Sequence, residues 1–301
     1  ECLVSLKLLT FMAQNQNQVM STAKKEYKRV TVKSLVDMKK NGEKISMLTA
    51  YDYSMAKIVD AAKVDVILVG DSGAMVMFGY ESTTPATMEE MLLMTKAVSR
   101  GAKKPLLIAD MPFMSYHVSI EESIRNAGKF VKDSGMHGVK LEGDRDIAKT
   151  IRAITKTGIP VMAHIGLKPQ TAKSWDGYRF QGTTYSSAKK LIEDAQELES
   201  AGAFCIVLEM ITKEISKLIT EHLSIPTIGI GSGQDCDGQI LVLHDILNLY
   251  DSIKPRFVKQ YADLKTETLK ALTNYKEDVV SGRFPDDEHS MSIDSSEFIK
   301  L

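Results

Sequence analysis

The sequence feature that most constrains the fold is a repeated alternation between short β-rich runs and longer helical runs, which starts at Lys44. The β-rich runs hold Val, Ile and Leu on consecutive positions, the pattern of strands buried on both faces. The runs between them carry apolar residues at helical spacing. Strands that alternate with helices along a chain pair in parallel through right-handed crossovers. The alternation therefore predicts one parallel sheet covered by helices.

The number of repeats decides between an open and a closed sheet. Seven β-rich runs are clear, and residues 238–245 supply an eighth after a connection that is short for a full helix. Seven or eight such units in one chain favour closure of the sheet. We therefore predict an α/β fold, a single (β/α)8 TIM barrel, with one additional C-terminal helix over residues 258–281 outside it.

The two ends of the chain differ from this repeating part. Residues 1–28 lack the alternation and are predicted to be a disordered extension, with an organelle transit peptide as the alternative. Residues 29–290 are predicted to form the barrel domain, and residues 291–301 a loose tail. A chain of 301 residues is long enough for one large domain of this kind.

Composition and charge exclude several classes of function. The chain carries 38 Lys and Arg against 39 Asp and Glu, a net charge of −1, so it has no general attraction for nucleic acid or an anionic membrane. No apolar stretch is long enough to cross a bilayer. The three cysteines, Cys2, Cys205 and Cys236, form neither a zinc-type cluster nor a paired framework. We expect a cytoplasmic protein that acts on small molecules, since a reducing compartment fits this cysteine usage.

Ionisable residues stand at the ends of the predicted strands. In a (β/α)8 barrel the carboxyl ends of all strands meet at one mouth, where active sites lie. The residues concerned are Asp52, Asp71, Asp110, Glu142, His164, Glu209 and the pair His244 and Asp245. A single acidic residue after a strand is often a helix cap or a turn former, and Asp52 is the clearest example. The ordered series is not explained in that way, because caps normally stand a few residues beyond the strand.

Three of these residues form a candidate metal site. Asp71, Asp110 and Glu142 come from neighbouring strands and offer hard oxygen donors, with no Cys among them. Several like charges at one mouth repel one another unless a cation lies between them. Carboxylate oxygens are the ligands that Mg²⁺ prefers, and Mg²⁺ commonly keeps positions for water and substrate oxygens. The trio therefore predicts a Mg²⁺ site.

Further residues are candidates for roles around this metal. Lys140 stands two positions before Glu142, so strand alternation turns both to one face, where Lys140 would pair with the carboxylates or hold a substrate anion. Glu209 ends an apolar strand away from the trio and is a candidate base with a raised pKa. His164 is ambiguous, because a histidine at a strand end is often structural. Residues 167–186 are long for a connection and are predicted to fold over the mouth.

The same residues lie within motifs that resemble the 3-methyl-2-oxobutanoate hydroxymethyltransferase (ketopantoate hydroxymethyltransferase) family. The resemblance covers about residues 44–290 and rests on an ordered set of motifs. They are LTAYDYSMAKIVD, ILVGDSGAMV, LLIADMPFMSY, GVKLEG, VMAHIGLKPQ, IVLE, IPTIGIGSG, DGQILVLHD and FPDDEHS. The family usually has Leu-Gly after Gly-Asp-Ser, whereas this chain has Gly73 and Ala74 there.

The resemblance implies a Mg²⁺-dependent, aldol-type transfer in pantothenate and coenzyme A biosynthesis. A hydroxymethyl unit passes from 5,10-methylenetetrahydrofolate to 3-methyl-2-oxobutanoate, a 2-oxo acid, and the products are 2-dehydropantoate and tetrahydrofolate. By the matching motifs, Asp71, Asp110 and Glu142 are the metal-associated carboxylates, and Glu209 is the proton acceptor.

The resemblance also implies contacts to the keto acid and an assembly state. Ser72 and Lys140 are expected to bind the keto acid, with Asp71 and Asp110 close to it and His164 in a supporting polar role. Members of the family form large homo-oligomers, commonly decamers, so a homo-oligomer is expected here as well.

Two other interpretations stay open on the sequence. Enzymes of the isocitrate lyase and phosphoenolpyruvate mutase group also gather carboxylates around a Mg²⁺-chelated 2-oxo acid. A lyase of that group needs its own catalytic cysteine motif, however, and Cys205 lies in mid-strand. The second alternative is a catalytically dead barrel that serves as a scaffold, in which metal and keto-acid binding would show no linkage.

Overall fold

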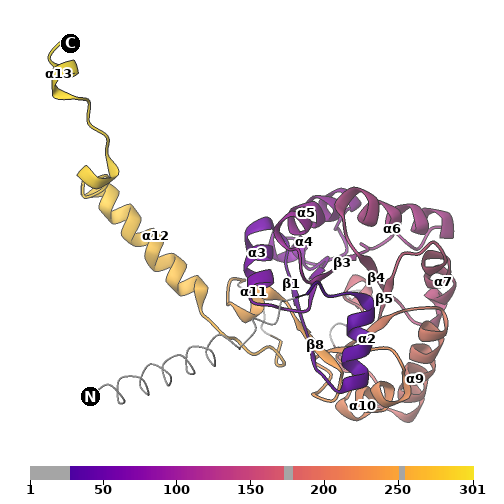
Figure 1. The fold of residues 1–301 in the computed structure, drawn as a ribbon. Helices are drawn as coiled ribbons and strands as arrows, with labels where there is room; N and C mark the ends of the chain where they lie inside the picture. Colours follow the sequence, from indigo (N-terminus) through magenta and orange to yellow (C-terminus); the bar gives the residue numbers. More distant parts are fainter. Residues whose placement is uncertain (1–27, 173–178, 251–254) are drawn as a thin grey trace, which may run out of the picture.

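Eight parallel strands form a closed barrel in the computed structural model, which describes residues 28–172, 179–250 and 255–301. Each strand pairs with the next in chain order, and β1 closes the ring against β8 (Figure 1). The strands are β1 Ile45–Thr49, β2 Val66–Val69, β3 Leu106–Asp110, β4 Gly138–Glu142, β5 Val161–Gly166, β6 Cys205–Glu209, β7 Thr227–Ile230 and β8 Gly238–Leu241. The predicted (β/α)8 barrel is confirmed.

Helices surround the barrel on its outside (Figure 1). The longer connecting helices are α3 Tyr53–Ala61, α5 Met88–Gly101, α6 Ile120–Ser134, α7 Ala148–Lys156, α9 Tyr185–Ser200 and α10 Lys213–His222. Short elements in the connections are α4 Gly73–Val76, η1 Arg145–Ile147, α8 Pro169–Ala172 and α11 Leu243–Ile246. Within the described ranges, no helix combines the length and the apolar character needed to cross a membrane.

The inward-facing side chains give the barrel an apolar amino end and a polar carboxyl end. Successive residues of a strand face opposite sides, so every second residue points into the barrel. The apolar ones form one buried cluster, which includes Ile45, Met47, Val66, Leu68, Leu106, Ile108, Met162, Cys205, Val207, Ile228 and Ile240. Two positions beyond Ile108, the same row ends on Asp110. The alternation that fills the interior thus delivers polar side chains to the mouth.

Helix α2, Val32–Asn41, lies across the amino end of the barrel (Figure 1). Leu35 is fully buried and belongs to the interior cluster. Lys39 Nζ forms an ion pair with Asp237 Oδ2, just before β8, at 2.8 Å. The sequence reasoning did not predict this helix, which closes the end of the barrel opposite the carboxylates.

The remaining elements correct two predictions. The additional C-terminal helix is α12, Leu264–Val280, and starts later than predicted because Asp263 caps it by accepting a hydrogen bond from the Thr266 N–H. Because β8 already ends at Leu241, His244 and Asp245 lie in α11 and not at a strand end. Beyond α12 come η2, Asp287–His289, and α13, Ser295–Phe298. The extension predicted for residues 1–28 falls outside the described residues, apart from its last position.

Candidate active site

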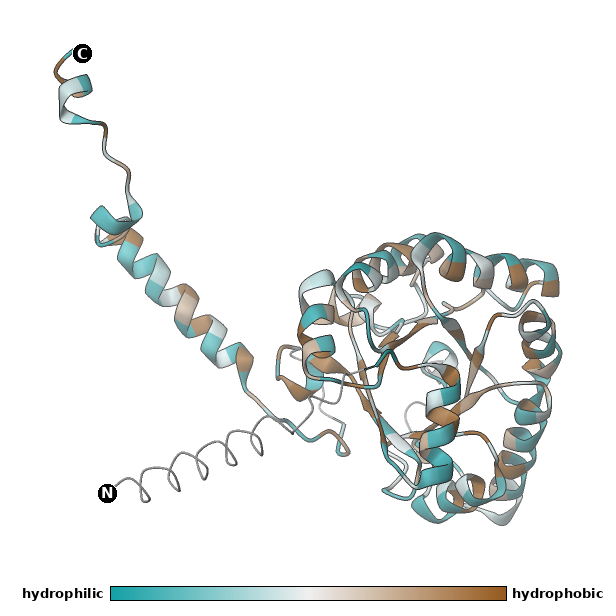
Figure 2. Cartoon of the chain, viewed as in Figure 1, coloured by the Kyte–Doolittle hydropathy of each residue, from teal (hydrophilic) through white to brown (hydrophobic). Residues whose placement is uncertain are grey.

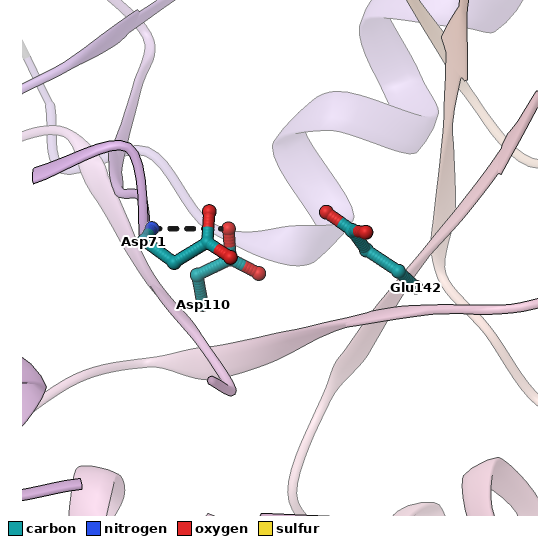
Figure 3. Close-up of side chains that lie close together, drawn as sticks. All are labelled: Asp71, Asp110 and Glu142. Atoms are coloured by element: carbon teal, nitrogen blue, oxygen red, sulfur yellow. Dashed lines mark hydrogen bonds between the residues drawn. The ribbon is translucent and has the colours of Figure 1, made fainter. Parts of the chain in front are cut away.

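The structure brings three carboxylates together at the carboxyl end of the barrel. Asp71 follows β2, whereas Asp110 and Glu142 are the last residues of β3 and β4. One oxygen of each lies within 4.8 Å of the others, and all three residues are buried. Figure 3 shows Asp71 and Asp110 side by side, with the Glu142 carboxylate directed toward them. The backbone N–H of Asp71 donates to Asp110 Oδ2 at 3.3 Å, which ties the turn after β2 to β3.

Lys140 lies against the same carboxylates, as strand alternation predicts. Its Nζ is 2.8 Å from both carboxylate oxygens of Asp110 and 3.2 Å from Glu142 Oε1. Burial alone would lower the pKa of Lys140, but the negative charges of Asp110 and Glu142 raise it above its usual value. Lys140 therefore stays charged and compensates part of the negative charge at the mouth.

Asp110 and Glu142 hold protons more tightly than surface acids do. Burial raises the pKa of Glu142 to about 7, with Lys140 opposing the rise and Asp71 adding to it. Burial also raises the pKa of Asp110 well above its usual value, against Lys140 and with the charges of Asp71 and Glu142. A hard divalent cation would relieve this repulsion, and carboxylate oxygens are its preferred donors. The residues thus fit the metal site predicted from the sequence.

His164, on β5, lies between Glu142 of the carboxylate trio and Glu209. Its Nε2 is 2.8 Å from the Leu167 carbonyl oxygen, which can only accept, so Nε2 carries the hydrogen. Burial, with the charge of Lys140, lowers the pKa of His164 far below its usual value, so the ring is neutral and Nδ1 is an acceptor. Among the described residues Nδ1 has no hydrogen-bond partner, although Glu142 Oε1 lies 3.6 Å away. A bound molecule with a donor group could use this lone pair.

Glu209 ends β6 and stands apart from the trio. Its Oε2 is 3.4 Å from His164 Nε2, and its side chain is 13% exposed, against 2% for that of Glu142. Burial raises the pKa of Glu209 well above its usual value, and the charge of Glu142 adds to the rise. Of the four acidic residues Asp71, Asp110, Glu142 and Glu209, Glu209 has the most exposed side chain.

Ser72 directly follows Asp71 and precedes the first residue of α4. Its Oγ lies 2.8 Å from the Tyr51 hydroxyl. A Cβ on Gly73 would lie 2.6 Å from Met94 Sδ and 2.8 Å from Tyr51 Cδ1. Glycine therefore lets the turn that carries Asp71 and Ser72 pack closely against Tyr51, at the position where the chain departs from the usual leucine of the resembling family.

The other residues at predicted strand ends do not join the carboxylate cluster. Asp52 accepts a hydrogen bond from the Met55 N–H at 2.9 Å and caps α3, which confirms the simpler interpretation of that residue. His244 and Asp245 lie on α11, where the His244 ring is 5.5 Å from the Tyr51 ring.

Two residues outside the strand-end series lie at the carboxylates: Gln170 contacts them directly, and Tyr116 contacts Gln170 and the Glu142 backbone. Gln170, in α8, donates from Nε2 to Asp71 Oδ2 at 3.0 Å and from its backbone N–H to Glu142 Oε2 at 3.2 Å. The Tyr116 hydroxyl is 2.7 Å from Gln170 Oε1. Neither residue stands at a strand end. The signals for them were the motifs LLIADMPFMSY and VMAHIGLKPQ, which end on Tyr116 and Gln170, and for Gln170 also its place in the long connection over residues 167–186. Residues 173–178 of that connection lie outside the described ranges.

Comparison with known sequences identifies the family. A model of the ketopantoate hydroxymethyltransferase family matches residues 29–287. The chain belongs to this family. The 3-methyl-2-oxobutanoate hydroxymethyltransferase of Nitrosopumilus maritimus (strain SCM1) is 52% identical over 271 residues, which are 90% of this chain and 97% of that protein. The enzyme of the same name from Clostridium botulinum (strain Alaska E43 / Type E3) is 50% identical over 271 residues, 90% of this chain and 98% of that protein.

Solved structures support the fold. A phosphonopyruvate hydrolase in complex with oxalate and Mg²⁺ aligns with a TM-score of 0.57 and 13% identity, over 90% of this chain and 94% of that one. A 2,3-dimethylmalate lyase of the PEP mutase/isocitrate lyase superfamily aligns with a TM-score of 0.53 and 15% identity, over 89% and 96%. At such low identity the likeness extends to the barrel fold alone, while the family match shows where this chain belongs.

Proposed function

We propose that the protein transfers a hydroxymethyl group from 5,10-methylenetetrahydrofolate to 3-methyl-2-oxobutanoate and so forms 2-dehydropantoate for pantothenate biosynthesis. The observation that carries the proposal is the buried trio Asp71, Asp110 and Glu142, with oxygens within 4.8 Å of one another, in a chain that the family model matches over residues 29–287. The overall transfer consumes one water, whose oxygen becomes the new hydroxyl group, and releases tetrahydrofolate.

The trio Asp71, Asp110 and Glu142 is proposed to hold Mg²⁺. When bound, this cation would supply Lewis-acid stabilisation of the negative charge that develops on the 2-oxo acid. Ser72 and Lys140 are proposed to bind the keto acid. The Lys140 ammonium group adds positive charge on the side of the mouth where the trio lies, 2.8 Å from the Asp110 oxygens.

Asp71 and Asp110 are also proposed to lie close to the keto acid, because they flank the same space at the mouth. His164 is proposed to have a supporting polar role through Nδ1, the buried acceptor that lacks a partner among the described residues. The keto acid itself has no donor group, so Nδ1 would accept from the new hydroxyl group of 2-dehydropantoate. A fixed acceptor of this kind orients a ligand without adding charge to the site.

Glu209 is proposed to be the general base. A carboxylate oxygen of Glu209 would remove the proton from C3 of the keto acid, which leaves the carbanion that forms the new carbon–carbon bond. Its separation from the trio and its greater exposure support this role, because a base must reach the substrate while the trio is occupied by metal.

The structural relatives of the phosphoenolpyruvate mutase and isocitrate lyase type are the alternative that shares the fold. A lyase of that type needs a catalytic cysteine, and among the described residues both cysteines are buried away from the carboxylates. Cys205 opens β6 at the amino end of the barrel, and burial raises the pKa of its thiol. This argues against lyase chemistry and favours the transferase.

Exchange of the C3 hydrogen of 3-methyl-2-oxobutanoate into deuterated water tests the proposal most directly. It follows enolisation without any folate, by nuclear magnetic resonance. We expect exchange that requires both the protein and Mg²⁺, and formation of 2-dehydropantoate once 5,10-methylenetetrahydrofolate is added. A protein that binds metal and keto acid without linkage between them, and exchanges no hydrogen, would instead be a non-catalytic scaffold.

The proposal also covers the oligomeric state of the protein and its cellular compartment. We propose a homo-oligomer, with a decamer as the first size to test. Helix α12 carries hydrophobic residues along its length (Figure 2), and the side chains of Leu269, Leu272 and Tyr275 among them are exposed. We also propose a cytoplasmic location, since Cys205 and Cys236 are free and buried, as suits a reducing compartment.

A further inference from the structure

Gln170 occupies an unusual place for a residue in a loop. It is only 3% exposed and lies among the carboxyl ends of three strands. Its Nε2 is 3.0 Å from Asp71 Oδ2 and 2.9 Å from the carbonyl oxygen of Met111, which follows β3. Its backbone N–H is 3.2 Å from Glu142 Oε2, at the end of β4. One residue of the connection after β5 thus holds two of the three metal carboxylates.

The hydrogen-bond partners allow only one orientation of the Gln170 amide. Its two N–H groups face a carboxylate oxygen of Asp71 and a carbonyl oxygen, and neither oxygen can donate when Asp71 is ionised. The Tyr116 hydroxyl accepts the Glu142 N–H at 3.2 Å, and its own hydrogen has two acceptors, Gln170 Oε1 at 2.7 Å and the Glu142 carbonyl oxygen at 3.1 Å. The shorter contact favours donation to Gln170 Oε1. A flipped amide would set its oxygen against two acceptors, Asp71 Oδ2 and the Met111 carbonyl oxygen.

We infer that Gln170 is a positioning residue for the divalent-cation site, with Tyr116 fixing the orientation of its amide. The inference rests on the proposed function, in which Asp71, Asp110 and Glu142 hold the cation. In this arrangement Lys140 orients Asp110 through both carboxylate oxygens, whereas Gln170 orients Asp71 and Glu142.

The chemistry of the donors explains why a glutamine suits this place. With the cation bound and all three carboxylates ionised, the trio and the Lys140 ammonium carry a net charge of −2, which a divalent cation balances. The amide groups of Gln170 are neutral, so they hold Asp71 and Glu142 in position without taking over the role of the cation. Partners of this kind preorganise metal ligands, and their loss weakens metal affinity by about 10- to 100-fold.

Gln170 also links the site to its surroundings. The Thr84 hydroxyl, in the connection between α4 and α5, donates to the Gln170 carbonyl oxygen at 3.1 Å. Together with the contacts to Asp71, Met111 and Glu142, this bond joins the segments that follow β2, β3 and β5 to the end of β4. Rotation of the Asp71 carboxylate away from the cation site would break its hydrogen bond to Gln170. The hydrogen bond therefore opposes that rotation.

The test measures Mn²⁺ binding to the full chain in the absence of both substrates, by the electron paramagnetic resonance signal of free Mn²⁺. Mn²⁺ accepts the same oxygen donors as Mg²⁺. Gln170→Met keeps the length of the side chain and removes the amide, and we expect its Kd for Mn²⁺ to rise about 10- to 100-fold. Gln181→Met is the matched control, because Gln181 lies on the same connection and its side chain, within the described residues, bonds only the Arg179 carbonyl oxygen.

A second readout separates positioning from a general loss of structure. If Gln170 positions the ligands, saturating Mg²⁺ should return kcat of Gln170→Met close to the wild-type value, while the Mg²⁺ concentration for half activation stays raised. A merely structural role would lower the unfolding temperature of the metal-free protein and leave the Kd for Mn²⁺ unchanged, which would overturn the inference.

Two more variants keep the outcome decisive. Tyr116→Phe removes a single hydroxyl group, so it tests the inference even where Gln170→Met fails to fold, and we expect a raised Kd for Mn²⁺. In the double variant Gln170→Met/Tyr116→Phe, the fold-increase in the Kd for Mn²⁺ should be smaller than the product of the two single fold-increases, because Tyr116 acts through Gln170. Asp110→Asn separates the proposed cation site from the proposed role of Gln170. Mn²⁺ binding at wild-type affinity in Asp110→Asn would refute the cation site itself. Weakened binding in Asp110→Asn, together with wild-type affinity in Tyr116→Phe and Gln170→Met, would refute only the role of Gln170.

Discussion

A carboxyl group at the mouth of this barrel differs from one on the surface because the surrounding protein removes most of its water. Burial and the nearby charge of Glu142 raise the pKa of Glu209, so its carboxylate attracts a proton more strongly than an ordinary glutamate does. The C3 hydrogen of a 2-oxo acid is only weakly acidic, so a stronger base assists its removal. The environment of Glu209 therefore suits the role proposed for it.

Glu209→Gln tests this role, since the amide is nearly isosteric with the acid but cannot take the proton. We expect Mg²⁺ and 3-methyl-2-oxobutanoate to bind as in the wild type. Deuterium exchange at C3 should fall by about 100-fold or more, the usual effect of losing a general base, and turnover should fall with it. Exchange that survives while turnover collapses would place Glu209 in folate handling, and a loss of metal or keto-acid binding would make it a ligand.

Lys140→Met tests the one cation found against the trio within the described chain. Because Lys140 contacts both Asp110 and Glu142, its loss leaves two buried carboxylates without a positive partner. We expect keto-acid affinity to fall more than Mg²⁺ affinity. The free energy of unfolding of the metal-free protein, measured in urea, should fall by about 3–5 kcal/mol, and Mg²⁺ should restore part of it. Wild-type affinity for the keto acid would show that Lys140 is only structural.

At the scale of single residues, the sequence predicts the orientation of those side chains whose direction follows from strand alternation. Lys140 and Glu142 stand two apart on one strand, so their common face was predictable, and the ion pair bears it out. The contacts of Gln170 were not predictable, because they depend on how a connection folds back over three strand ends. The protonated nitrogen of His164 was not predictable either, since the Leu167 carbonyl group decides it.

Among the elements, those with a strong repeating pattern were predicted and those held by a few contacts were not. The strands and their connecting helices follow from buried runs and helical spacing. Helix α2 buries only Leu35 fully, and its other apolar residues, Val32, Val36 and Met38, are partly buried. It precedes the first strand and lies outside the repeating alternation, so that pattern did not indicate it. Helix α2 is stabilised by its contact with the amino end of the barrel, and a local sequence pattern does not predict such a tertiary contact.

The connection between α6 and β4 carries a group that makes stability depend on pH. His137 Nδ1 accepts the N–H of Leu107 on β3 at 2.9 Å. Burial, with the neighbouring charge of Arg29, lowers the pKa of His137 to about 4. In the unfolded chain a histidine titrates near its usual value of about 6.5. Between these values the unfolded chain binds the extra proton, so this contribution to stability is complete above about pH 6.5 and is lost as the pH falls toward about 4.

His137→Asn tests this dependence, because asparagine keeps an acceptor for the Leu107 N–H but does not titrate. Urea unfolding of both proteins at about pH 7 and about pH 4.5 brackets most of the window. We expect the wild type to lose more unfolding free energy over this interval than His137→Asn. Equal losses in the two proteins would show that His137 does not contribute to the acid sensitivity.

The whole molecule has one functional end and one structural end. The carboxylates lie at the carboxyl ends of the strands, and α2 with the apolar interior cluster fills the opposite end. The repeat count predicts this architecture, because a closed ring of parallel strands gathers every strand end at one mouth. The course of α12 away from the barrel (Figure 1) was not predicted from its helical pattern, since a surface helix and a projecting helix can share the same spacing.

Helix α12 carries the prediction at this scale. Leu269, Leu272, Tyr275, Val279 and Val280 lie on one side of it and are between 46% and 79% exposed. Exposed apolar patches of this kind mark interfaces, and the proposed homo-oligomer would cover this one. Leu272→Asp places a charge in the middle of the patch, whereas Asn274→Asp adds the same charge on the opposite side of the helix.

We expect light scattering after size-exclusion chromatography to show a homo-oligomer for the wild type and for Asn274→Asp, and a smaller assembly for Leu272→Asp. Because α12 lies away from the mouth (Figure 1), Leu272→Asp should keep its affinity for Mn²⁺. A wild-type monomer would refute the proposed assembly. A Leu272→Asp variant of unchanged mass would mean that the subunits meet through another surface, and that the apolar side of α12 serves a different purpose.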